Sequence, residues 1–154
     1  MADSPSVASV ADFNAAMTSG KTFQLSGRPA KHTVLFFYPK DNTPGCTTEN
    51  MAFRDLHEQF TAAGAEIYGI SRDSIRSHEG FKTKLGLPFE LISDPDEVVC
   101  QLFGVMKMKQ MYGKTVRGVE RSTFVIDASG RLVKEWRGVK VAGHVDEVLE
   151  FVKS

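Results

Sequence analysis

The fold class of this chain is decided by the stretch Thr33-Val34-Leu35-Phe36-Phe37-Tyr38-Pro39-Lys40-Asp41-Asn42-Thr43-Pro44-Gly45-Cys46. Its first six residues form a continuous apolar run, which is typical of a strand buried on both faces of a sheet. Pro39 ends that strand, and the polar residues up to Gly45 favour a tight turn. A helix is expected from there to Gly64, because apolar residues then recur at helical spacing. A buried strand, a turn and an amphipathic helix together indicate an α/β domain.

The rest of the chain continues this alternation of strands and helices. The expected elements are a short hairpin reaching 22–25, a strand at 65–70, a helix from Ser74 to about Leu85, a short strand at 89–92, a helix from 94 to Gly104, a connection from 106 to 120, a hairpin of strands 122–127 and 132–137, and a last helix around 145–152. The order β-α-β-α-β-β-α predicts a thioredoxin-like α/β fold, with a central mixed β-sheet and helices on both faces. Without internal repeats or linkers, residues 1–154 are predicted to form one domain.

Composition excludes several classes of function. The chain has 154 residues, with 19 basic and 19 acidic side chains, so no overall field attracts nucleic acid or an anionic membrane. Its longest apolar run is too short to cross a bilayer, and residues 1–20 lack the pattern of a secretory signal. Two cysteines are too few for a disulfide framework and suit a reducing compartment. We therefore expect a cytoplasmic protein with neither nucleic-acid nor membrane partners.

Cys46 is the candidate nucleophile. It is expected in the first helical turn, where free N–H groups and the positive end of the helix dipole favour a thiolate over a thiol. Pro44 suits the first helical position, and Thr43 is the expected N-cap, with its hydroxyl within reach of the backbone or the sulfur. A lone cysteine is often an inert small apolar residue. Its position after a strand and a turn, where α/β domains place their chemistry, favours a reactive thiol instead.

The segment around Cys46 resembles the peroxiredoxin active-site signature Pro-x-x-x-Thr-x-x-Cys, carried here by Pro39, Thr43 and Cys46, with Gly45 as a supporting residue. The flanking residues are similar to the peroxiredoxin Q subfamily, also called bacterioferritin comigratory protein. Further segments match that subfamily in order from about Phe23 to the end, namely 69–74, 91–94, 118–127 and 143–149. The resemblance implies a peroxiredoxin fold and a thiol-dependent peroxidase acting on hydrogen peroxide and organic hydroperoxides.

The resemblance also implies a role for each matching residue. Cys46 is the peroxidatic cysteine, which attacks the O–O bond and becomes a sulfenic acid. Thr43 hydrogen-bonds the sulfur and the incoming peroxide, and Arg121 holds the thiolate and stabilises the charge that develops as the O–O bond breaks. Pro39 packs over the pocket and limits water access. Glu49 orients the arginine, although by itself an acid here could simply favour the helix N-terminus.

The chain departs from its relatives at the resolving cysteine. Relatives carry that second thiol five residues after the first, where this chain has Met51, or in the following helix, where it has Lys82. The remaining thiol, Cys100, matches a cysteine of some relatives that is not the usual resolver. We expect it to be partly exposed, off an apolar helix face formed by Val98, Val99, Leu102 and Phe103. A one-cysteine mechanism with an external thiol is predicted, such as thioredoxin, glutaredoxin or glutathione, while resolution by Cys100 stays open.

A second class of function remains open, in which Cys46 is oxidised but cycles slowly, as in a thioredoxin-fold redox sensor or binding module. Pro39, Thr43 and Arg121 together favour the enzyme, because a sensor needs only a reactive thiol. No metal or other cofactor is expected, since the histidines are scattered and no Cys-x-x-Cys occurs. His144 is predicted at the surface, and Lys107, Lys109 and Lys114 in a solvated loop. The expected assembly is a monomer or a weak homodimer.

Overall fold

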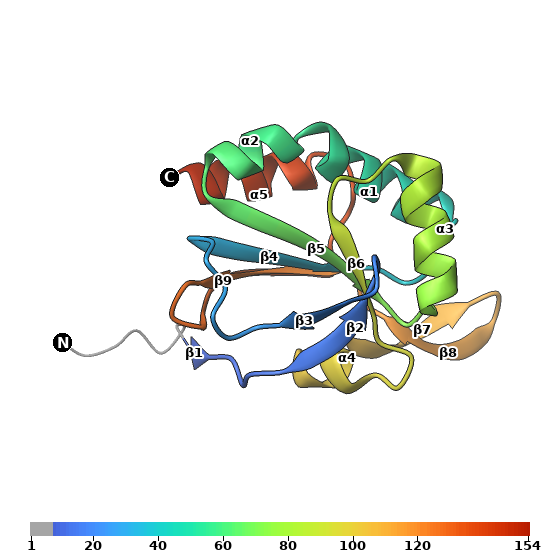
Figure 1. Ribbon diagram of the computed structural model, residues 1–154. Helices are drawn as coiled ribbons and strands as arrows, with labels where there is room; N and C mark the ends of the chain where they lie inside the picture. Colours follow the sequence, from blue (N-terminus) through green and yellow to red (C-terminus); the bar gives the residue numbers. More distant parts are fainter. Residues whose placement is uncertain (1–7) are drawn as a thin grey trace.

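A computed structural model describes residues 8–154 and shows an eight-stranded mixed sheet with the strand order β1-β10-β9-β4-β5-β6-β2-β3 (Figure 1). Its strands are β1 (Ala8–Ser9), β2 (Asn14–Met17), β3 (Lys21–Gln24), β4 (His32–Phe37), β5 (Ala65–Ser71), β6 (Glu90–Ser93), β9 (Ser122–Asp127) and β10 (Arg131–Arg137). The helices are α1 (Pro44–Asp55), α2 (His57–Ala62), α3 (Ile75–Leu85), α4 (Val98–Leu102) and α5 (His144–Lys153). The predicted thioredoxin-like architecture is confirmed.

Strand β4 is central to the sheet. It pairs in parallel with β5, where Phe36 lies opposite Gly69, and antiparallel with β9, where Phe37 lies opposite Ser122. Because successive side chains point to opposite faces of a strand, β4 contributes to two separate cores. The cores are covered by α1, α2, α3 and α5 on one face of the sheet and by α4 on the other (Figure 1).

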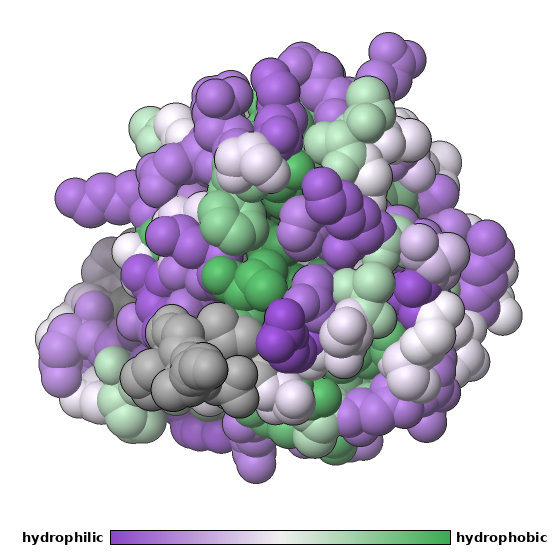
Figure 2. Space-filling view, turned by 90° about the vertical axis from the view of Figure 1, so that its left-hand side faces the viewer, coloured by the Kyte–Doolittle hydropathy of each residue, from purple (hydrophilic) through white to green (hydrophobic). Residues whose placement is uncertain are grey.

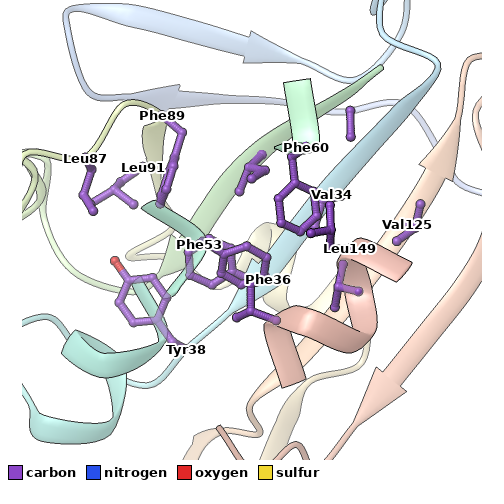
Figure 3. Close-up of a cluster of buried hydrophobic side chains, with 14 of the residues drawn as sticks. Val34, Phe36, Tyr38, Phe53, Phe60, Leu87, Phe89, Leu91, Val125 and Leu149 are labelled. Atoms are coloured by element: carbon purple, nitrogen blue, oxygen red, sulfur yellow. The ribbon is translucent and has the colours of Figure 1, made fainter. Parts of the chain in front are cut away.

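The core beneath α1 and α5 is rich in aromatic side chains (Figure 3). Phe36 stacks on Phe53 of α1 with ring centroids 4.3 Å apart, and Phe53 in turn contacts Phe60 of α2 at 5.7 Å. Burying one such ring contributes about 3 kcal/mol to stability. These contacts fix α1, and with it Cys46, against the carboxyl end of β4.

Gly69 leaves room for this packing. A Cβ placed there would lie 2.8 Å from Cζ of Phe36 and 2.8 Å from Cδ2 of Leu91. Both atoms are buried, so neither side chain could move away freely. A glycine in the middle of β5 is therefore required by the large ring on the neighbouring strand.

Three expectations about the elements were wrong. The helix expected from residue 94 begins only at Val98, with Glu97 as its N-cap. The helix expected up to Gly64 is divided at Leu56, whose φ and ψ of −101° and 5° leave the helical region. The connection expected over 106–120 contains a hairpin of β7 (Met106–Met111) and β8 (Lys114–Val119). Its two turn residues, Tyr112 and Gly113, both have positive φ, 52° and 78°, which suits a two-residue hairpin turn. The alternation of methionine and lysine over residues 106–109 in β7 was the available sequence signal.

The end of the molecule opposite α3 has a mainly hydrophilic surface around a small hydrophobic area (Figure 2). Among residues 8–154, no helix has the length and apolar character needed to cross a membrane.

Candidate active site

Cys46 lies in the first turn of α1, where the chain has just left the central strand β4. Its side chain is 1% exposed and belongs to the aromatic core beneath α1. Pro44 opens the helix, as predicted, and Thr43 precedes it with extended backbone angles of −98° and 152°. The sulfur is thus shielded from bulk water and close to the free N–H groups of a helix N-terminus.

Arg121 is in contact with Cys46, although it lies 75 residues later in the sequence. It lies between β8 and β9, and because β9 pairs with β4 as far as Phe37, its side chain reaches the turn that follows β4. Nη2 donates to Sγ of Cys46 at 3.5 Å, and Nη1 donates to Oε1 of Glu49 at 2.6 Å. The guanidinium therefore bridges the sulfur and a carboxylate on α1.

Gly45 provides the space for this bridge. A Cβ at this position would lie 3.2 Å from Nη2 of Arg121, closer than ordinary packing allows. The sequence placed Gly45 among the supporting residues, and the structure supplies a steric reason for a glycine there.

Glu49 is fully buried one helical turn after Cys46. Burial raises its pKa to about 7, although the contact with Arg121 opposes that increase. Burial by itself would lower the pKa of Arg121. The neighbouring Glu49 and Cys46 have a larger effect in the opposite sense, so the pKa of the arginine is raised. Oε2 of Glu49 has no hydrogen-bond partner within the described part of the chain. Glu49 thus depends on Arg121 for its charge compensation.

Thr43 and Pro39 flank the turn before the cysteine, and both are half-buried. The hydroxyl of Thr43 donates to the carbonyl of Lys40 at 2.7 Å and makes no side-chain cap on α1. The capping role expected for this hydroxyl is therefore wrong. Its oxygen keeps lone pairs that could accept a hydrogen bond from an incoming ligand.

Two polar residues near Cys46 were not assigned to the site from the sequence. Asn50 is buried, and its Nδ2 donates to the carbonyl of Cys46 at 2.9 Å. Lys109, expected in a solvated loop, is half-buried on β7 and donates to the carbonyl of Val119 at 2.6 Å. Burial lowers the pKa of Lys109, as does Arg121, whereas Glu120 and Cys46 act in the opposite sense. A second cation therefore lies within electrostatic reach of Cys46, and only the hairpin, which the sequence did not predict, brings it there.

Cys100 is not the partly exposed residue that was expected. It is 0% exposed and packs in the second core, on the α4 side of the sheet, whereas Val98 and Leu102 are 65% and 42% exposed. The helix is turned because the carboxylate of Asp94 accepts from the backbone N–H groups of Val99 and Cys100. Burial raises the pKa of the Cys100 thiol, and the neighbouring Asp94 adds to this effect.

His144 is likewise buried, at 4% exposure, instead of lying at the surface. Its Nε2 is 2.8 Å from Oγ1 of Thr123, and its ring meets Trp136 edge-on at 5.6 Å. Burial lowers the pKa of His144 to about 4. It therefore serves as a neutral residue that packs the start of α5 against β9.

Comparisons with known proteins show which family this sequence and fold resemble. The AhpC/TSA family matches residues 8–135. Peroxiredoxin Bcp of Bacillus subtilis is 52% identical over 134 residues, covering 87% of this chain and 85% of the relative. A solved structure of Xanthomonas campestris Peroxiredoxin Q is 47% identical, with a TM-score of 0.85 over 92% of this chain and 89% of that one.

A second solved structure is that of the bacterioferritin comigratory protein of Xanthomonas campestris, described for its alkyl peroxide reduction activity. It is 46% identical, with a TM-score of 0.84 over 92% of this chain and 90% of that one. The matches in sequence and in fold cover nearly the whole of the described chain. This chain therefore belongs to the AhpC/TSA family and is a peroxiredoxin, a thiol-dependent peroxidase.

Proposed function

We propose that Cys46 is the nucleophile of this peroxidase and that Arg121, Thr43, Pro39, Glu49 and Gly45 form its site. The thiolate attacks the terminal oxygen of a hydroperoxide, so that an S–O bond forms while the O–O bond breaks. The leaving oxygen takes up a proton and departs as an alcohol, or as water when the substrate is hydrogen peroxide. Cys46 is left as a sulfenic acid.

The contact between Arg121 and Cys46 carries this proposal. The guanidinium already lies 3.5 Å from the sulfur and is held by Glu49 at 2.6 Å. A fixed cation in a site shielded from water stabilises the thiolate, and then the negative charge that moves onto the peroxide oxygens. Thr43 complements it, because its oxygen can accept a hydrogen bond from the hydroperoxide O–H.

Resolution of the sulfenic acid is proposed to use an external thiol. Cys46 belongs to the core beneath α1, whereas Cys100 belongs to the core on the other side of the sheet. A disulfide needs Cα atoms within about 7 Å, so these two cysteines could pair only after large rearrangement. The buried Cys100 thiol, with its raised pKa, is also a poor nucleophile.

Reduction of the Cys46 sulfenic acid by an external reductant consumes two thiols. The first attacks the sulfenic acid, releasing water and forming a mixed disulfide with Cys46. The second attacks that disulfide, restores the Cys46 thiol and leaves as the oxidised reductant. Thioredoxin, glutaredoxin and glutathione all supply such thiols, and the cytoplasm is the compartment that maintains them. Organic hydroperoxides are included as substrates because the Xanthomonas campestris relative is described as reducing alkyl peroxides.

The two cysteines offer a matched test. Cys46→Ser should abolish peroxide consumption, while Cys100→Ala should retain near-normal turnover with an external thiol. After one equivalent of peroxide, peptide mass spectrometry should find a sulfenic acid or its sulfinic product on Cys46. A Cys46–Cys100 disulfide formed on the catalytic timescale, with turnover lost in Cys100→Ala, would overturn the one-cysteine mechanism. Slow oxidation without turnover by any thiol would favour a redox sensor instead.

A further inference from the structure

A buried hydrogen-bond network holds the turn that carries Cys46, at a distance from the reacting atoms. Its centre is Asp41, which lies five residues before Cys46 and is 3% exposed. Oδ1 of Asp41 accepts from the hydroxyl of Tyr38 at 2.6 Å, and its backbone N–H donates to Asp73 at 3.0 Å. In Figure 3 the Tyr38 hydroxyl points away from Phe36 and Phe53. The turn is thus fixed to the end of β4 and to the loop after β5.

Helix α3 supplies the remaining bonds to Asp41. Oδ2 accepts from Oγ of Ser77 at 2.8 Å and lies 2.7 Å from Nδ1 of His78. His78 is 0% exposed, and its other ring nitrogen, Nε2, lies 3.0 Å from the carbonyl oxygen of Ile92. One imidazole therefore connects the active-site turn to β6 through the interior of the protein.

Both ring nitrogens of His78 face oxygen acceptors. A carbonyl oxygen can only accept, so Nε2 must carry a proton. Nδ1 lies 2.7 Å from Oδ2 of Asp41, so the ring has an oxygen within hydrogen-bond distance at each of its two nitrogens. Asp73 and Tyr38 are the other titratable groups in this network, and the Ser71 hydroxyl, 3.5 Å from Nε2, donates to Asp73. The contact with Asp41 gives Nδ1 of the fully buried His78 its hydrogen-bond partner, and it adds to the bonds that Asp41 receives from Tyr38 and Ser77.

The turn connects this network to Cys46. Asn42, directly after Asp41, has a φ of 64°, in the left-handed region, which asparagine adopts more readily than most other residues that carry a side chain. Between Asn42 and Cys46 lie only Thr43, Pro44 and Gly45. Release of Asp41 would therefore free the segment that fixes Cys46 beside Arg121.

We propose that His78 is a positioning residue for peroxide reduction: by binding Asp41 it keeps the turn at 39–45 in the conformation that holds Cys46 against Arg121. The proposal rests on Cys46 being the nucleophile. It assigns His78 no contact with the peroxide. Loss of the His78–Asp41 pair should slow attack by Cys46 and increase the opening of the turn.

The test compares His78→Leu with Val152→Ala, a buried substitution in α5 at the far side of the core. Peroxide consumption in single turnover, hydrogen exchange of residues 40–47 and the Tm would be measured on each. His78→Leu should lose at least about 10-fold in rate and exchange faster in the turn, whereas Val152→Ala should do neither for a comparable loss of Tm. Hydrogen exchange does not depend on the peroxidase assignment, so failure of the two proposals can be distinguished.

Two further measurements keep the proposal falsifiable if His78→Leu does not fold. His78→Asn retains a donor for Asp41 and should recover part of the rate and of the protection of the turn. In the unmodified protein, ¹H NMR should show a ring N–H proton of His78 that exchanges slowly with solvent, because both ring nitrogens are buried against oxygen atoms. A ring N–H proton of His78 that exchanges rapidly with solvent, or variants with the normal rate and normal exchange in the turn, would overturn the proposal.

Discussion

Replacement of Arg121 by alanine should have two effects, one on the rate of peroxide reduction and one on stability, because Arg121 has two contacts in the site. The substitution removes the 3.5 Å contact with Sγ of Cys46 and the 2.6 Å contact with Oε1 of Glu49. Loss of a charge-stabilising donor costs about 3–4 kcal/mol in the transition state, so the rate of peroxide reduction should fall by roughly 10²–10³. Alkylation of Cys46 by iodoacetamide at neutral pH should become slower, because the nearby cation favours the reactive thiolate.

The same substitution leaves Glu49 buried without a cation. The carboxyl group can then avoid its charge only by keeping a proton, so its folded pKa should rise above the present value of about 7. A folded pKa above the unfolded one means that stability is present at low pH and lost as pH rises, by up to about 1.4 kcal/mol per pH unit. Arg121→Ala should therefore be less stable at pH 8 than at pH 6.

Stopped-flow peroxide consumption and denaturant unfolding at both pH values measure the two effects. The double variant Arg121→Ala, Glu49→Gln should recover the stability that Arg121→Ala loses at pH 8, because the glutamine removes the buried charge. It should not recover the rate of peroxide reduction, because the cation beside Cys46 is still missing. Arg131→Ala is the matched control, since Arg131 is an exposed arginine paired with Asp127 at 3.4 Å. An unchanged rate of peroxide reduction and an unchanged rate of alkylation in Arg121→Ala would refute the assignment of Arg121 to the site.

Three other predictions follow from the packing and the buried titratable groups. Glu49→Gln alone should lower the rate of peroxide reduction several-fold, because a neutral amide holds Arg121 less firmly. In stopped-flow assays across pH 6–8, the dependence of this rate on pH should also lose its step near pH 7, and an unaltered pH dependence would count against this role of Glu49. Gly69→Ala should destabilise the protein by about 1–3 kcal/mol in urea unfolding, since the methyl group would meet Phe36 and Leu91. His144, with its pKa lowered from 6.5 to about 4, stabilises the fold above pH 6.5, and up to about 3 kcal/mol should be lost as pH falls toward 4. Unfolding of His144→Gln should show less of that acid sensitivity.

Local sequence determined the strand β4, the turn after it and the start of α1. An apolar run ended by Pro39 and a turn closed by Pro44 and Gly45 leave few other conformations, and these features placed Cys46 correctly in a first helical turn. Cap residues were equally informative for α3, where Ser74 accepts from Ser77 N–H and Gly86 adopts the left-handed region, as expected. Such signals act over a few residues, so they can be recognised in the sequence without knowledge of the fold.

Tertiary structure decided which polar groups meet and which side chains are buried, although the family resemblance already implied that Glu49 orients Arg121. Arg121 and Glu49 are separated by 72 residues and His78 and Asp41 by 37. Each pair forms only because the loops and helices that carry both partners adjoin the same end of the central strands. The orientation of α4 depended on Asp94 binding two of its N–H groups, which buried Cys100 and exposed Val98 against the apolar pattern. Hydrophobic spacing predicts that a helix has a buried face, but hydrogen bonds from outside the helix select that face.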